Sequence, residues 1–147
     1  MKSISYAGFW LRFLAWAVDT FITMIFIFLF GLYSYSAVAI GYELTESIPF
    51  MEFLKWLRLL LMVAIVWLYF ALMESSKWQA TIGKRIFSII VTDYHGKRIS
   101  FPRATGRYFG KILSNATLLI GYVIAGFTTR KQALHDFIAG TIVIKEG

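Results

Sequence analysis

Residues 13–33 read FLAWAVDTFITMIFIFLFGLY, and Asp19 is the only charged residue in this stretch. A helix that spans a bilayer needs roughly 20 consecutive, mostly apolar residues. An ionisable side chain inside such a helix is costly and points by default to a functional site. Ala37-Val38-Ala39 resembles a signal-peptidase site. The apolar region is too long for a signal peptide and contains Asp19, so we expect an uncleaved first span from about Trp10 to Tyr33.

The composition of the 147-residue chain is that of a membrane protein, with 59% hydrophobic residues, 18% aromatic residues and a net charge of +7. Eight of the fifteen Lys and Arg residues fall between Lys77 and Lys111, where only Asp93 opposes them. A basic patch beside spanning helices indicates a cytoplasmic loop and contact with anionic lipids, and it argues against nucleic acid as the partner. The chain has no cysteine, which excludes disulfides and thiolate metal sites.

A second span is predicted from about Phe53 to Met73, with its most apolar part from Leu59. Residues 34–53, between the two spans, carry three glutamates and no basic residue. Since basic residues mark the cytoplasmic side, we place the N-terminus and residues 74–108 in the cytoplasm of a multi-pass protein of the inner (plasma) membrane.

Residues 86–101 predict a short cytoplasmic β-hairpin. Ile86 to Val91 is rich in β-branched residues, Asp93 to Gly96 supplies turn formers, and Ile99 to Phe101 resumes the apolar alternation. A two-stranded hairpin is only marginally stable alone, and Thr141 to Ile144 is the obvious third strand.

The third apolar stretch, Ala104 to Phe127, leaves two topologies open. A single crossing would put the C-terminal strand outside, whereas a re-entrant helical hairpin broken near Asn115 or Gly121 would return it to the cytoplasm. Non-helical backbone at membrane depth is tolerated where protein or water satisfies it. We favour the re-entrant form. The predicted fold class is therefore an all-α polytopic membrane protein with two full transmembrane helices, this third segment and the small hairpin.

Asp19 is the first candidate for an ion- or proton-binding residue. Arg12 lies two helical turns before it but leans toward the helix N-terminus, away from Asp19, and is expected to clamp another segment. Thr23, one turn further on, adds an oxygen to the same face, and hard cations such as sodium prefer oxygen ligands. The alternative is a structural Asp19 that pairs with a buried cation. Its candidate partners are Arg107, Lys111 and Arg130.

Two further acidic residues accompany Asp19. Glu74 closes the second span, where it either joins the polar cluster or caps the helix end. His135 and Asp136 are adjacent, so on a helix their side chains point about 100° apart, and no Ser or Cys nucleophile completes a triad. We therefore expect no enzymatic activity, no cofactor and no resident metal, apart from a transported monovalent cation at Asp19.

The sequence resembles the RDD family of bacterial integral membrane proteins, which is named for one arginine and two aspartates. Residues 6–19, YAGFWLRFLAWAVD, carry the Arg and the first Asp as the family places them. Residues 78–85, WQATIGKR, match the segment Q-A-T-x-G-K-R, and residues 132–141 match the closing H-D-x-x-A-G-T motif. The resemblance covers essentially the whole chain, so we expect a single RDD-like membrane domain over residues 1–147.

The resemblance implies a transport function, including sodium–proton antiport, for this chain. It assigns importance to Arg12, Asp19, Lys84, Arg85 and Asp136, and we expect Arg12 and Asp136 to form a cytoplasmic gate beneath Asp19. Three short segments are few for a permeation path, so a homo-oligomer is expected. The alternative is a non-enzymatic scaffold or accessory protein that binds a partner or anionic lipid through its basic cytoplasmic face.

Overall fold

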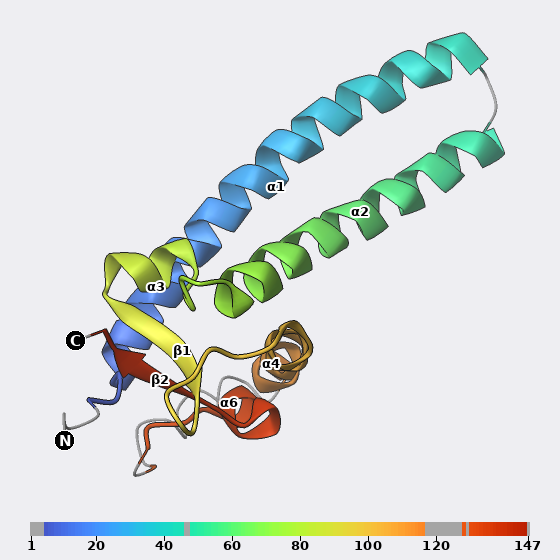
Figure 1. Ribbon diagram of the computed structural model, residues 1–147. Helices are drawn as coiled ribbons and strands as arrows, with labels where there is room; N and C mark the ends of the chain where they lie inside the picture. Colours follow the sequence, from blue (N-terminus) through green and yellow to red (C-terminus); the bar gives the residue numbers. More distant parts are fainter. Residues whose placement is uncertain (1–4, 46–47, 117–127, 129, 147) are drawn as a thin grey trace. The chain divides into compact units, whose positions relative to one another are not determined.

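The computed structural model describes residues 5–45, 48–116, 128 and 130–146 (Figure 1). Most of them are helical, and a two-stranded sheet is the only sheet among them. They form two compact units: Met1–Asp19 with Trp67–Gly147, and Thr20–Val66. We call the first the sheet unit and the second the helical hairpin unit. The predicted fold class included such a small β element beside the helices, and here residues 89–93 pair with the C-terminal residues 141–145.

Two long apolar helices match the predicted spans but extend further. Helix α1 runs from Phe9 to Thr45 and α2 from Ile48 to Ser75, and each contains a window apolar enough to cross a membrane. The predicted acidic loop over residues 34–53 is therefore mostly helical. Pro49 lies at the second position of α2, where a missing backbone N–H costs nothing.

In the helical hairpin unit, large apolar side chains face outward. Phe28 is 65% exposed and Leu60 is 66% exposed. In water such surface would be unfavourable, whereas lipid chains would cover it. Met51, by contrast, is buried and packs at Gly41, where an added Cβ would meet its Cε at 2.8 Å.

The sheet unit contains the remaining elements. Helix α3 spans Ile82–Ile86 and leads into strand β1, Ile89–Asp93. Helix α4 follows at Phe101–Ala116, then the short helix α6 at Leu134–Ala139 and strand β2 at Thr141–Lys145. Buried Ile89, Val91 and Val143 form its apolar core together with Ile99 and alanines of α1, α2 and α4.

Strands β1 and β2 pair antiparallel, with Val91 opposite Val143 and Asp93 opposite Thr141. This confirms the predicted pairing with the C-terminal strand. The predicted strand at residues 99–101 is wrong: a single bridge joins Thr92 to Arg98, and Phe101 already begins α4. Pro102 explains this, because proline favours the first turn of a helix and cannot donate to a central strand.

The segment before α1 also joins the sheet. The Ala7 backbone N–H donates to the Val143 carbonyl at 2.9 Å, and the Lys145 N–H donates to the Ser5 carbonyl at 2.8 Å. Residues 5–7, which precede α1, and strands β1 and β2, which follow α2, thus hydrogen-bond to one another. They therefore lie on the same side of any bilayer that α1 and α2 cross. The choice between a single crossing and a re-entrant hairpin for the stretch 104–127 depends on residues 117–127, which lie outside the described residues.

The predicted break in the third apolar stretch is only partly within the described residues. Helix α4 continues through Asn115 to Ala116 without a break. Gly121, the other predicted position, lies outside the described residues.

Candidate functional site

The Asp19 carboxylate binds the start of helix α3. Thr81 Oγ1 donates to Oδ2 at 2.5 Å, and the Gly83 backbone N–H donates to Oδ1 at 2.8 Å. The Tyr69 hydroxyl donates to Oδ1 at 3.2 Å and accepts a hydrogen bond from the Ile82 N–H. Unpaired N–H groups at a helix start attract negative charge, so Asp19, which is 2% exposed, acts as a cap supplied by another helix.

Gly83 is required by this contact. A Cβ at this position would lie 2.2 Å from the Ala15 carbonyl oxygen and 2.9 Å from Asp19 Cγ. Real Cβ contacts are never this short, so a side chain would push α3 away from α1. In the T-x-G-K segment, Thr81 therefore donates a hydrogen bond to Asp19, and Gly83 allows α3 to approach α1 closely.

Thr23 was predicted to add an oxygen to the face of Asp19. Its hydroxyl donates to the Thr20 carbonyl at 2.9 Å, and it belongs to the helical hairpin unit, whereas Asp19 belongs to the sheet unit. The three predicted ion-pair partners of Asp19 are engaged elsewhere. Arg107 binds two other carboxylates, Lys111 binds Glu74, and Arg130 lies over the Tyr94 ring.

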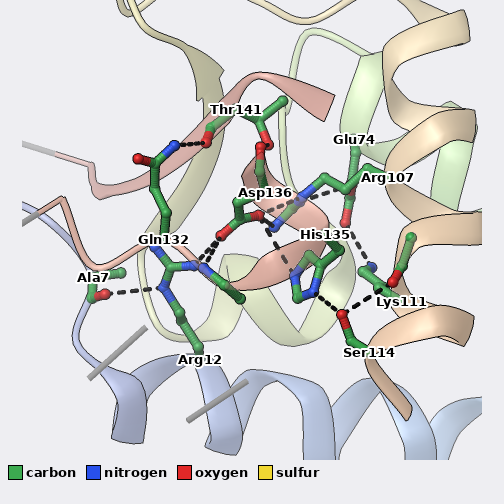
Figure 2. A network of polar contacts seen from close by, with 12 residues as sticks. Ala7, Arg12, Glu74, Arg107, Lys111, Ser114, Gln132, His135, Asp136 and Thr141 are labelled. Carbon is green, nitrogen blue, oxygen red and sulfur yellow. Dashed lines mark hydrogen bonds and ion pairs between the residues drawn. The ribbon is translucent and has the colours of Figure 1, made fainter. Parts of the chain in front are cut away.

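A second polar cluster, which we call the charge network, joins both long helices to α4 and α6 (Figure 2). Asp136 accepts from Arg12 Nη1 and, at 2.8 Å, from Arg107 Nε. Arg107 Nη1 in turn donates to Glu74 Oε2 at 2.9 Å. The other Glu74 oxygen accepts from Lys84 and, at 3.1 Å, from Lys111.

The position of each acidic group follows from its helix. Asp136 is in the first turn of α6, where its carboxylate also accepts the Ala133 N–H at 3.2 Å. Glu74 is in the last turn of α2, where it contacts residues of α3 and α4. Asp136 is fully buried, and Glu74 and Arg107 are 1% and 2% exposed. The contact expected between Arg12 and Asp136 is confirmed; its gating role stays a prediction.

The network holds more positive than negative charge. Four cations, Arg12, Lys84, Arg107 and Lys111, surround the carboxylates of Glu74 and Asp136. Burial, reinforced by the charge of nearby Arg107, lowers the pKa of Lys84 to about 7. Although burial alone would raise it, the charge of Arg107 holds the pKa of Asp136 well below its usual range. The charge of Lys84 therefore changes near neutral pH.

His135 is neutral at pH 7, because burial lowers its pKa to about 3. Its Nδ1 lies 3.4 Å from Ser114 Oγ, and its Nε2 lies 3.5 Å from Asp136 Oδ1. Figure 2 shows the ring between Ser114 and Asp136. The described residues contain no cluster of three or more His, Cys, Asp or Glu residues that could hold a metal ion.

Arg85 does not join the network. It pairs with Glu146 at 2.8 Å, and both side chains are nearly half exposed.

Several contributors were not predicted from sequence. Tyr69 and Thr81 bind Asp19, and Gln132 Nε2 donates to the Thr141 carbonyl at 2.9 Å, which ties the segment before α6 to strand β2. Thr81 and Gln132 lie within the quoted motifs, which was a usable signal. Tyr69 lies in an apolar run, where an aromatic residue carries no such signal.

Residues 6–140 match the RDD family. The uncharacterized protein YxaI of Bacillus subtilis (strain 168) is 36% identical over 146 residues, which cover 94% of this chain and 96% of that protein. The uncharacterized membrane protein YteJ of the same strain is 29% identical, over 97% of this chain and 82% of that protein. No solved structure matches the chain. Arg12, Asp19 and Asp136, whose contacts are given above, are the arginine and the two aspartates for which the family is named. The chain belongs to the RDD family.

Proposed function

We propose that this chain is a multi-pass protein of the bacterial cell membrane that exchanges a monovalent cation for protons. The observation that carries the proposal is the position of Asp19. It is a buried carboxylate in an apolar helix, it contacts two hydroxyl groups, and the Gly83 N–H that binds it immediately precedes Lys84. Ionisable groups at membrane depth mark ion pathways and proton relays in other membrane proteins.

The spans we propose are α1 and α2, with the N-terminus in the cytoplasm. Support comes from charge: the sheet unit contains most of the basic residues, whereas Glu43, Glu46 and Glu52 lie in the sequence between the two predicted spans. Two spans provide little room for a permeation path. We therefore include a homo-oligomer in the proposal.

In this scheme Asp19 is the cation ligand and Lys84 exchanges the proton. The hydroxyls of Thr81 and Tyr69 can rotate and present lone pairs to a hard cation. A cation bound at Asp19 adds positive charge beside Gly83, the residue that precedes Lys84, and in this scheme the added charge favours the neutral amine, so Lys84 releases its proton to water. When the cation leaves, the proton returns. Because the pKa of Lys84 is about 7, exchange is expected to vary most steeply near neutral pH.

The test is a flux measurement on the full chain reconstituted in vesicles that contain a pH-sensitive dye. A gradient of sodium, lithium or potassium is applied, and proton movement is recorded. Asp19→Asn should abolish cation-dependent proton movement, while Asp93→Asn, at an exposed turn outside the site, should leave it intact. Lys84→Gln should remove the dependence of the rate on pH around 7. Absence of exchange by the wild-type protein in all three gradients would reject the proposal.

A second candidate is a non-enzymatic accessory protein, which the exposed arginines and lysines of the sheet unit favour. Lys97 and Arg98 are exposed beside the Asp93 turn, and Arg103 is exposed on α4. Under this alternative, charge reversal at Lys97 and Arg98 breaks the interaction with a partner or with lipid, and Asp19→Asn lowers stability. Proton exchange that survives those reversals but not Asp19→Asn would favour transport.

A further inference from the structure

Helix α4 is amphipathic in the reverse sense to a helix of a soluble protein. Its charged and polar residues Arg107, Lys111 and Ser114 point into the charge network, and Arg107 is only 2% exposed. Its opposite side carries Phe109 and Leu113, which are 55% and 53% exposed. On a surface helix in water the apolar side would face the core.

Helix α6 repeats this arrangement. His135 and Asp136 are buried, whereas the next two residues, Phe137 and Ile138, are 48% and 53% exposed. The two helices pack together through Gly110, where an added Cβ would lie 3.1 Å from His135 Cβ and 3.6 Å from Ile138 Cδ1. The exposed apolar side chains of α4 and α6 therefore belong to one continuous surface.

We call this surface the α4–α6 face: Phe109, Ile112 and Leu113 of α4 with Phe137 and Ile138 of α6. Beside it lies an open cavity of about 610 Å³, which Phe137 and Ile138 line together with Pro102 and Arg103. Arg103 is exposed, and Arg130 lies 5.3 Å from the centre of the Tyr94 ring at the same cavity. The apolar surface thus has a basic and aromatic border.

The contacts of α4 with α2 place this face beside a spanning helix. The Phe101 and Phe109 rings, eight residues apart or about 12 Å along α4, both lie within 6.4 Å of the Trp67 ring. Tyr108 packs on Phe70, one turn further along α2. These contacts hold α4 against the part of α2 that belongs to the sheet unit, so α4 lies beside the end of any span that α2 forms.

We infer that the α4–α6 face is a second membrane-contact surface, which lies in the headgroup–acyl boundary of an anionic bilayer beside the end of α2. A helix in this position buries its apolar side about 5–10 Å deep, and basic side chains at its border contact lipid phosphates. Arg103 is placed for that contact. The surface also keeps water from the charge network, which lies directly behind α4.

The chain has no cysteine, so a single introduced thiol reports one position. Leu113→Cys and Ile138→Cys, each labelled with bimane, are reconstituted as full-length protein. The vesicles contain phosphatidylcholine and phosphatidylglycerol, with or without a lipid that carries a doxyl quencher near the headgroup. Leu60→Cys on α2 is the control for lipid contact, and Lys97→Cys is the control for solvent contact.

The expected result is a blue-shifted emission at positions 113 and 138, quenching by the doxyl lipid, and protection from aqueous iodide. Quenching by iodide as strong as at position 97 would overturn the inference. Protection from both quenchers would also overturn it, because a second copy of the chain or another protein would then cover the face. Arg103→Gln, or omission of phosphatidylglycerol, should reduce lipid quenching at position 113; an unchanged signal in both would contradict the role of Arg103.

Discussion

Replacement of Gly83 by alanine tests the contact between Asp19 and α3 most directly. The new Cβ would lie 2.2 Å from the Ala15 carbonyl oxygen, whereas ordinary contacts begin at 3.4 Å, so α3 must move by 3.4 − 2.2 = 1.2 Å. This displacement would stretch the Gly83 N–H to Asp19 hydrogen bond from 2.8 Å to about 4.0 Å, beyond the reach of a hydrogen bond. The Thr81 hydrogen bond, on the same segment, would be lost with it.

Hydrogen bonds to a charged group contribute roughly 1.5–3 kcal/mol each, so losing two costs about 3–6 kcal/mol. Alanine regains about 1 kcal/mol over glycine in a helix, which leaves a net loss in the free energy of unfolding of roughly 2–5 kcal/mol. Thermal unfolding in detergent measures it. The matched control is Gly31→Ala, since an added Cβ there has nothing within 4 Å and should be neutral or mildly stabilising. Equal stability of the two variants would refute the reasoning.

Three more predictions concern charge. Arg107→Met removes the cation shared by both buried carboxylates and should cost about 3–5 kcal/mol of unfolding free energy, against about 0.5 kcal/mol or less for Arg103→Met on the surface. The pKa of Lys84 is about 7 in the folded chain and near 10.5 in the unfolded chain, so between these pH values the unfolded chain binds more protons. The free energy of unfolding should therefore rise with pH from about 7, and Lys84→Gln should flatten that rise. Arg85→Ala removes an exposed ion pair with Glu146 and should cost about 1 kcal/mol or less.

Each of these has a contradicting outcome. Similar unfolding temperatures for the Arg107 and Arg103 variants would mean that the buried carboxylates do not depend on Arg107. A wild-type protein whose stability falls between pH 7 and 10 would reverse the sign assigned to Lys84. A large loss in Arg85→Ala would show that this surface pair supports the fold.

The sequence alone predicted the long helices, because an apolar run of this length rarely adopts any structure other than a long helix. It also predicted that β1 would pair with the C-terminal strand and that Arg12 would meet Asp136. The strand expected at residues 99–101 failed for a local reason. Ile99 is compatible both with an alternating strand and with a buried turn. Pro102 favours the first turn of a helix, and α4 begins at Phe101.

The partners of Asp19 could not be predicted in the same way. Arginine and lysine were the natural candidates by charge, yet the described contacts come from two hydroxyls and a backbone N–H. Backbone donors leave no trace in a sequence, and Tyr69 resembles any other aromatic residue of a spanning helix. The apolar character of residues 104–127 also did not predict that α4 begins at Phe101. Nor did it predict that the Arg107 side chain of α4 is buried, because hydrophobicity alone does not tell which side of a helix is buried.

The separation of Arg12 and Asp136 along the chain has a consequence for biogenesis. Their contact spans 124 residues, and β2, which binds both β1 and residues 5–7, follows every other described element. During synthesis Arg12 therefore has no Asp136 carboxylate to bind until α6 has been made, and residues 5–7 cannot join the sheet until β2 has been made. A chain that stops before residue 132 therefore lacks the contacts that join its first helix to α6 and to the sheet.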